Sequence, residues 1–274
     1  MKITADRVTA ERYSMEYITF GGGDRPIVIL PGMGLRSVIP SAGQIAAQYA
    51  CFCEKYKVYL IERKNDMEEG YTVSDMADDT ADAMTRLGIS GACVLGISQG
   101  GMIAGLIAAR NPALVSRLVL ASTSAKLNDT ARETFTRWIS LARDGRAEEL
   151  NRDMFGRIYS AEYYEKYREE FALFEKMGTA EEIKRALVLA LACLQNDSYE
   201  ELGNISCPTL VIGAGDDRVL GCGASAEIAE KIGCGLYVYD GASHAVFDEA
   251  EDYPCRVLDF FDRRELTDFS ERIL

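Results

Sequence analysis

The chain has 274 residues, which is enough for one large domain or for one domain that carries an insertion. Its 43 acidic and 30 basic side chains leave a net charge of −13, and such a surface repels phosphate backbones and anionic lipid. We therefore expect neither nucleic acid nor a membrane among its partners. No apolar run approaches the ~18 residues of a membrane span, and the amino terminus has no secretory signal, so we expect a cytoplasmic protein.

Short continuous apolar runs recur along the chain, and each indicates a strand buried on both faces. These runs cover residues 26–30, 57–61, 92–96, 118–121, 209–213 and 236–239. Apolar residues at helical spacing predict helices over 73–87, 102–110 and 224–232, and a last helix over about 249–263. Strands that alternate with helices predict an α/β fold, in which a parallel sheet carries helices on both faces.

One stretch, from about residue 128 to residue 202, differs in composition from the rest. It is charged, rich in Tyr and Phe, and typical of several amphipathic helices with no strand among them. We interpret it as an inserted helical cap, which gives a cap of residues 126–203 and a core of residues 1–125 and 204–274. Some of its aromatic side chains could line an apolar pocket, although more are expected to pack the cap helices together.

The candidate nucleophile is Ser98, in the sequence Gly96-Ile97-Ser98-Gln99-Gly100, which matches the pattern G-x-S-x-G. The motif lies between a predicted strand and a helix of small residues. A turn that sharp leaves no room for side chains at the flanking positions, which explains the glycines. The alternative is a purely structural glycine-rich turn.

A serine hydroxyl needs a base, and a carboxylate must then support the imidazolium that forms. His244 is the only histidine of the chain, and it follows the last predicted strand. Two acids, Asp216 and Asp217, follow the strand before it. Adjacent loop residues point in different directions, so we expect only one of them to face the histidine.

The negative charge that develops on the attacked carbonyl oxygen needs two hydrogen-bond donors. We expect one to be the backbone N–H of Gln99. The second should come from the loop 31–34, after the first predicted strand, and we assign it to the N–H of Met33. That glycine-rich loop could equally be a simple turn.

The eight cysteines are scattered, without a repeated CxxC pair. Zinc sites need Cys and His at short spacings, and a chain of this length does not need disulfides to fold. We therefore predict no metal site, and we expect most cysteines to be small core residues.

With the motifs LPGMG, GISQGG, GAGDDRVLG and GASHA, the sequence resembles the α/β-hydrolase fold family from about residue 13 to residue 261. The resemblance implies a helical cap between the sixth and seventh strands and hydrolysis without a cofactor. The family's acid motif favours Asp217 over Asp216, with Gly221 in place of the usual proline. Pro31 stands where the family's oxyanion loop usually has histidine.

These observations predict a serine hydrolase that cleaves a carboxylic ester, a thioester or an amide of a small acyl substrate, most simply as a carboxylesterase. Acyl transfer and C–C bond hydrolysis would use the same residues. A ligand-binding receptor on this fold is a further alternative. The sequence leaves a homo-oligomer open, because residues 264–274 could form either a helix end or a subunit contact.

Overall fold

The computed structural model describes residues 2–263, and one eight-stranded sheet runs through them in the order β1-β2-β4-β3-β5-β6-β7-β8. The antiparallel pairs are β1 with β2 and β2 with β4, and β3 to β8 run parallel. The strands are β1 (Thr4–Ala10), β2 (Tyr13–Phe20), β3 (Arg25–Leu30), β4 (Tyr56–Lys64), β5 (Ala92–Ile97), β6 (Val115–Ala121), β7 (Thr209–Ala214) and β8 (Gly235–Tyr239).

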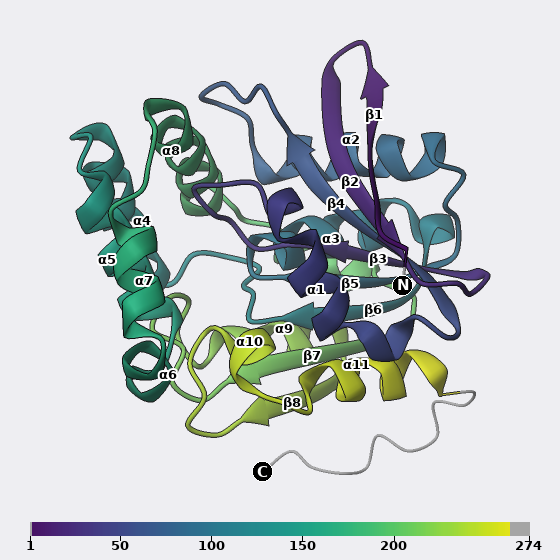
Figure 1. Ribbon diagram of the computed structural model, residues 1–274. Helices are drawn as coiled ribbons and strands as arrows, with labels where there is room; N and C mark the ends of the chain where they lie inside the picture. Colours follow the sequence, from purple (N-terminus) through teal and green to yellow (C-terminus); the bar gives the residue numbers. More distant parts are fainter. Residues whose placement is uncertain (1, 264–274) are drawn as a thin grey trace.

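Helices cover both faces of this sheet (Figure 1). Outside the stretch between β6 and β7 they are α1 (Ala42–Gln48), α2 (Val73–Arg86), α3 (Gln99–Arg110), α9 (Ala224–Ile232), α10 (Val246–Glu249) and α11 (Tyr253–Asp262). Side chains alternate along a strand, so Val28 and Leu30 of β3 pack into the core formed with α2, α3 and α9. Ile27 and Ile29 pack into the opposite core, with α1 and α11.

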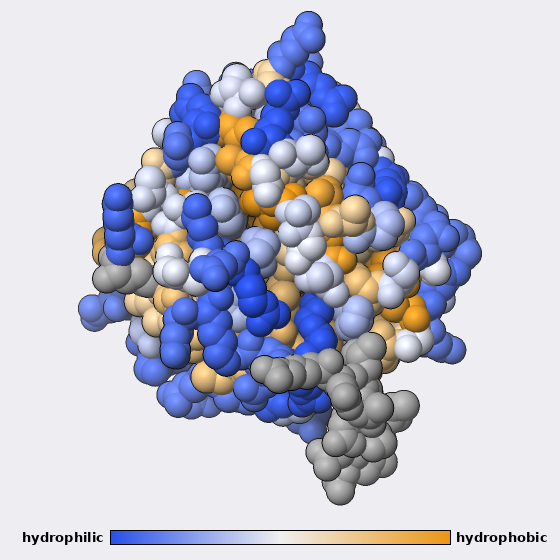
Figure 2. Space-filling model, turned by 90° about the vertical axis from the view of Figure 1, so that its right-hand side faces the viewer, coloured by the Kyte–Doolittle hydropathy of each residue, from blue (hydrophilic) through white to orange (hydrophobic). Residues whose placement is uncertain are grey.

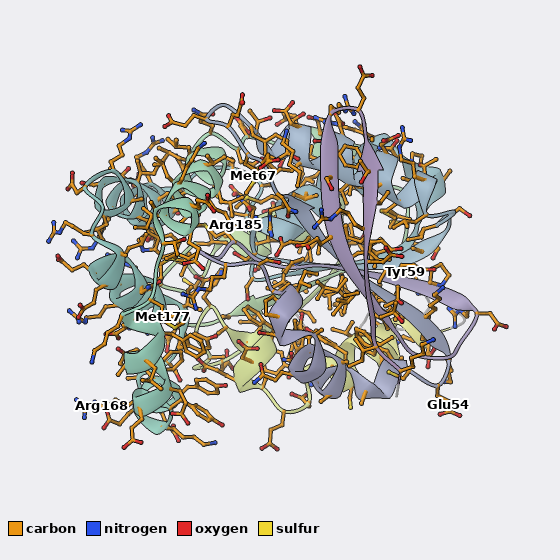
Figure 3. All side chains as sticks on the ribbon, turned by 45° about the horizontal axis from the view of Figure 1, so that its top comes forward. Glu54, Tyr59, Met67, Arg168, Met177 and Arg185 are labelled. Carbon is orange, nitrogen blue, oxygen red and sulfur yellow. The ribbon has the colours of Figure 1, made fainter. Side chains whose placement is uncertain are left out.

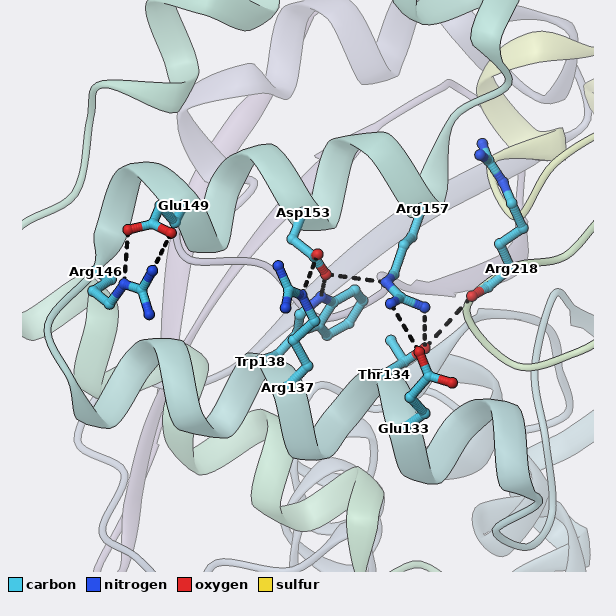
Figure 4. A network of polar contacts seen from close by, with 9 residues as sticks. All are labelled: Glu133, Thr134, Arg137, Trp138, Arg146, Glu149, Asp153, Arg157 and Arg218. Atoms are coloured by element: carbon cyan, nitrogen blue, oxygen red, sulfur yellow. Dashed lines mark hydrogen bonds and ion pairs between the residues drawn. The ribbon is translucent and has the colours of Figure 1, made fainter.

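The α4–α8 segment lies between β6 and β7, and its helices are α4 (Asp129–Arg143), α5 (Ala147–Ile158), α6 (Ala161–Lys166), α7 (Arg168–Glu175) and α8 (Ala180–Leu194). The parallel strands point their carboxyl ends toward it (Figure 1). Within the segment, Asp153 of α5 accepts a hydrogen bond of 2.9 Å from the Trp138 indole of α4 and pairs with Arg137 (Figure 4). The division into core and cap at 126–203 stays a prediction.

Each predicted strand lies inside an observed one, whereas β1 and β2 were not predicted. β1 is mostly exposed and β2 alternates, so neither shows a continuous apolar run. The predicted helix over 249–263 is wrong at its start, because α10 ends at Glu249 and α11 begins at Tyr253. Pro254, which fits only the first turn of a helix, explains the break.

The expectation that most cysteines are core residues is confirmed for five of the eight. Cys93 and Cys193 are buried in the core, and Cys53, Cys207 and Cys234 are partly buried and pack against it. Cys51, Cys222 and Cys255 are exposed.

Hydrophilic residues predominate on the face shown in Figure 2, and apolar ones show mainly near its middle. In the part of the chain that the structure describes, no helix is both long and apolar enough to cross a bilayer. The alternatives raised for residues 264–274 lie outside the described residues.

Candidate active site

Ser98 stands at the sharp turn between β5 and α3, with φ of 53° and ψ of −120°. Few non-glycine residues adopt a positive φ, so the surroundings must hold this one in place. The Ser98 N–H donates to the Ala121 carbonyl at 2.9 Å, and its carbonyl accepts from Thr123 Oγ1 at 2.7 Å and from the Gly101 N–H at 2.8 Å. The backbone is therefore fixed, and the half-buried side chain stays available.

Glycine is required beside the turn because the backbones approach closely there. A Cβ at Gly100 would lie 2.0 Å from the carbonyl oxygen of Leu30, and a Cβ at Gly96 would lie 2.5 Å from the carbonyl oxygen of Gly100. Real Cβ atoms do not come that close to other atoms, so both positions exclude every other residue in this conformation.

His244 lies in the loop after β8, and its Nε2 is 3.0 Å from Ser98 Oγ. The residues on either side bond to consecutive carbonyls at the end of α5. Ser243 Oγ donates to the Arg157 carbonyl at 3.4 Å, and the Ala245 N–H donates to the Ile158 carbonyl at 2.9 Å. The α4–α8 segment thus holds the loop that carries the histidine, whose side chain is almost completely buried.

Asp217, after β7, lies behind the histidine, with Oδ2 at 2.8 Å from His244 Nδ1. Its other oxygen, Oδ1, accepts the N–H groups of Val219 and Leu220, each at 2.8 Å. Burial raises the pKa of Asp217, but His244 and these N–H groups outweigh burial and hold the pKa below the usual aspartate value. An ionised Asp217 accepts a hydrogen bond from the Nδ1–H of His244, which leaves Nε2 without a proton and able to take one from Ser98.

Asp216 does not contact the histidine. Its side chain is exposed, and its N–H donates to the Ala242 carbonyl at 2.9 Å. Of the two adjacent acids, Asp217 is the one that the structure brings to His244.

Two backbone segments lie beside Ser98, as the assignment of the oxyanion donors requires. Gln99 opens α3, where N–H groups point out of the helix end. The loop 31–34 passes close by, because a Cβ at Gly32 would lie 3.3 Å from Ser98 Cβ and 3.8 Å from Ser98 Oγ. Met33 follows in that loop, half-buried. Donation by Met33 and Gln99 stays a prediction.

A buried charge cluster near this site was missed by the sequence reasoning. Glu62, only 1% exposed, accepts from Arg63 at 3.0 Å and pairs with Arg185 of α8 at 2.9 Å. The available signal was a Glu-Arg pair directly after the apolar run 57–61, at the carboxyl end of a strand. The partner in α8 gave no sequence signal.

A polar groove of 1390 Å³ approaches Asp217 and Ser243 from the α5 side. Arg157 and Arg218 line it, and Figure 4 shows both joined to Thr134, whose Oγ1 accepts from Arg157 at 3.3 Å and donates to the Arg218 carbonyl at 3.5 Å. In residues 2–263, no group of three or more His, Cys, Asp or Glu side chains is arranged to hold a metal ion.

The model of the alpha/beta hydrolase fold family matches residues 26–251. The chain is 28% identical over 257 residues to a Rhizobium rhizogenes protein provisionally named carbamate hydrolase RutD, across 89% of this chain and 96% of that protein.

Two solved structures share the fold over most of their length. MGS-M2, an alpha/beta hydrolase from a deep-sea metagenome library of the Medee basin, has a TM-score of 0.84 at 22% identity, covering 95% of this chain and 98% of that one. The enol-lactonase of Burkholderia xenovorans LB400 has a TM-score of 0.82 at 21% identity, covering 94% and 100%. The chain therefore belongs to the α/β-hydrolase fold family, as a hydrolase.

Proposed function

We propose that the protein is a serine hydrolase, which cleaves a carboxylic ester, thioester or amide of a small molecule through an acyl-serine intermediate. The observation that carries the proposal is one continuous chain of hydrogen bonds. Ser98 Oγ contacts His244 at 3.0 Å, and His244 contacts Asp217 at 2.8 Å. A hydroxyl, an imidazole and a buried carboxylate in this order are the parts that nucleophilic acyl transfer needs.

In the first half of the reaction, Ser98 Oγ attacks the carbonyl carbon while His244 Nε2 takes the hydroxyl proton. Asp217 holds the ring in the required tautomer and stabilises the imidazolium. The N–H groups of Met33 and Gln99 donate hydrogen bonds to the oxyanion, and the positive amino end of the α3 dipole stabilises its charge further. The leaving group departs with the proton from His244, which leaves an acyl-serine.

In the second half, His244 takes a proton from a water molecule, whose oxygen attacks the acyl-serine carbonyl. The tetrahedral intermediate uses the same two donors, and its collapse releases the carboxylic acid and restores Ser98. The α4–α8 segment, which the carboxyl ends of the strands face, acts in this proposal as a cap over the acyl substrate.

The names of the relatives narrow the substrates worth testing first. An enol-lactone is a cyclic ester, and a carbamate also presents a carbonyl with a heteroatom leaving group. Attack by Ser98 on the carbonyl carbon would cleave either substrate, the enol-lactone or the carbamate. Acyl transfer and C–C bond hydrolysis need no additional residue, so product analysis must separate them from ester hydrolysis.

The test is hydrolysis of p-nitrophenyl acetate, of an enol-lactone and of an aryl carbamate by the wild type, Ser98→Ala and Ser116→Ala. Ser116 is an exposed serine of β6 and serves as the matched control. The proposal expects activity in the wild type and the control, and a loss of several orders of magnitude in Ser98→Ala. Full activity in Ser98→Ala would contradict it. Products trapped with added alcohol or thiol would reassign the enzyme to acyl transfer.

A further inference from the structure

Helix α8 contacts both of the segments to which the oxyanion donors are assigned. The first contact is made by Gln99, whose side chain is completely buried. Its Nε2 donates to the Leu189 carbonyl at 2.9 Å and to Cys193 Sγ at 3.1 Å, and both acceptors belong to α8. The residue to which one donor N–H is assigned is thus anchored to α8 by its own side chain.

The second contact runs to the loop after β3. Glu62 Oε2 accepts the Val38 N–H at 3.0 Å, and Oε1 of the same carboxylate pairs with Arg185 of α8 at 2.9 Å. Figure 3 shows Arg185 on the side of α8 that faces the sheet. A further ion pair, at 2.7 Å, joins Arg36 of this loop to Glu182 in the first turn of α8.

Arg63 completes this cluster at the other end of the loop. One of its terminal nitrogens donates to Glu62 at 3.0 Å, and the other donates to the Pro31 carbonyl, directly before Gly32. The loop that passes Ser98 is therefore held at Pro31 by Arg63 and at Val38 by Glu62.

Two guanidinium groups and one carboxylate share this site, and the most exposed of them, the side chain of Arg185, is only 13% exposed. Burial raises the pKa of Glu62, but Arg63 and Arg185 outweigh burial and keep it below the usual glutamate value, so the group is charged. Buried ion pairs contribute little to stability compared with apolar side chains of similar volume. Their placement between α8 and the loop points to a role in geometry.

We propose that α8 braces the oxyanion hole: through Arg185 and Glu62, and separately through the Gln99 side chain, it fixes the two donor segments relative to each other. This inference rests on the proposed serine hydrolase activity. Arg185, Glu62 and the Gln99 side chain are positioning residues, since they act through the N–H groups of Met33 and Gln99.

Two variants test the two contacts independently, and both keep every backbone N–H. Arg185→Met removes the ion pair with Glu62, and Gln99→Met removes the bonds to Leu189 and Cys193. Displacing a donor by a fraction of an ångström is expected to lower kcat/KM for p-nitrophenyl acetate by about 10- to 100-fold. Arg185→Lys, which keeps the charge, is expected to restore part of the loss.

A trifluoromethyl ketone distinguishes this role from a purely structural one. The Ser98 oxygen adds to its carbonyl carbon and the hydroxyl proton passes to His244, so the adduct carries the oxyanion. Its affinity should fall by the same factor as kcat/KM in both variants, while the shape of the pH profile stays that of the wild type. Lower stability without this parallel loss of affinity would overturn the inference.

The matched control is Arg110→Met, which removes the ion pairs of Arg110 with Glu201, at 2.7 Å, and with Asp78. Arg110 is the last residue of α3, at the opposite end of that helix from Gln99, and none of these three residues belongs to α8. It should leave kcat/KM and ketone affinity unchanged. If the wild type hydrolyses the ester but Arg185→Met and Gln99→Met behave like the control, only the brace is wrong. If the wild type neither hydrolyses esters nor binds the ketone, the proposed function fails and the brace fails with it.

Discussion

At the scale of single residues, Asp217 shows how a charge is kept inside the protein. Its side chain is almost completely buried, and burial alone would favour the neutral acid. Two N–H groups on Oδ1 and the imidazole on Oδ2 replace the lost water. Asp216, one residue earlier, has none of these contacts and faces solvent, so two adjacent acids have very different environments.

This difference predicts the effects of two isosteric variants. Asp217→Asn should lower kcat/KM by about 10²- to 10⁴-fold, because an amide cannot hold His244 in the same tautomer with the same charge. Asp216→Asn should stay within about twofold of the wild type, as is usual for exposed residues away from the chemistry. Ester hydrolysis assays on both variants check this. Equal losses would contradict the assignment of Asp217 as the residue that supports His244. A larger loss in Asp216→Asn would assign that role to Asp216.

Ser98, His244 and Asp217 could be singled out from the sequence because each follows a recognisable apolar strand. Parallel strands bring their carboxyl ends to one edge, so residues 98, 217 and 244 can meet there although they are far apart in the chain. Choosing Asp217 over Asp216 needed the family's motif as well. Glu62 could not be connected with Arg185, since no local pattern indicates which charge of α8 turns toward the core.

At the scale of elements, the β5–α3 turn depends on how closely its backbone passes that of β3. The Leu30 carbonyl occupies the space that a side chain at residue 100 would need. Gly156 in α5 is different, because a Cβ there would meet nothing within 4 Å. Glycine is therefore required at position 100, whereas position 156 has room for a side chain.

Replacing each glycine by alanine should give effects of opposite sign. Gly100→Ala is expected to be severely destabilising, because the turn and β3 must move apart. Gly156→Ala should raise the free energy of unfolding by roughly 0.5–1 kcal/mol, the helix-propensity difference between the two residues. Denaturant unfolding of both variants measures this. A Gly100→Ala protein as stable as the wild type would contradict the close packing described for the turn.

The strands at the centre of the sheet and β8 at one edge were predictable, whereas β1 and β2 at the other edge were not. β3, β5, β6 and β7 are buried on both faces and so appear as continuous apolar runs. β1 and β2 form an antiparallel pair with exposed residues, and charged and polar side chains interrupt their pattern. β1 and β2 pair with each other as a hairpin, with Ala10 opposite Tyr13, and β2 joins the rest of the sheet through β4, which is distant in the sequence.

At the scale of the whole molecule, the buried carboxylates of Asp217 and Glu62 make the stability of the fold depend on pH. The pKa values of Asp217 and Glu62 are lower in the folded protein than their ordinary values. In acid, the unfolded chain therefore binds protons that the folded protein does not. The stability that these two groups contribute is fully present above their pKa values in the unfolded chain. It is lost as the pH falls through their lower pKa values in the folded protein.

We therefore expect the free energy of unfolding to decrease as the pH falls below about 4.5, where an unfolded glutamate begins to protonate. Asp217→Asn removes one of the two groups, so its stability should depend less steeply on pH in this range. Urea unfolding of both proteins at a series of pH values measures the slopes. Stability that increases on acidification would contradict the ionised state of these groups.

The most direct test of the central claim, that His244 and Asp217 activate Ser98, is the intact mass of the protein after exposure to a fluorophosphonate probe. Wild type, Ser98→Ala and Ser116→Ala are compared. One adduct in the wild type and in Ser116→Ala, and none in Ser98→Ala, is the predicted result, because only a serine with a base in place attacks the probe at a useful rate. An adduct that persists in Ser98→Ala would assign the reactive nucleophile to another residue. No adduct on a folded wild type would contradict an activated Ser98 and favour a ligand-binding role for this fold.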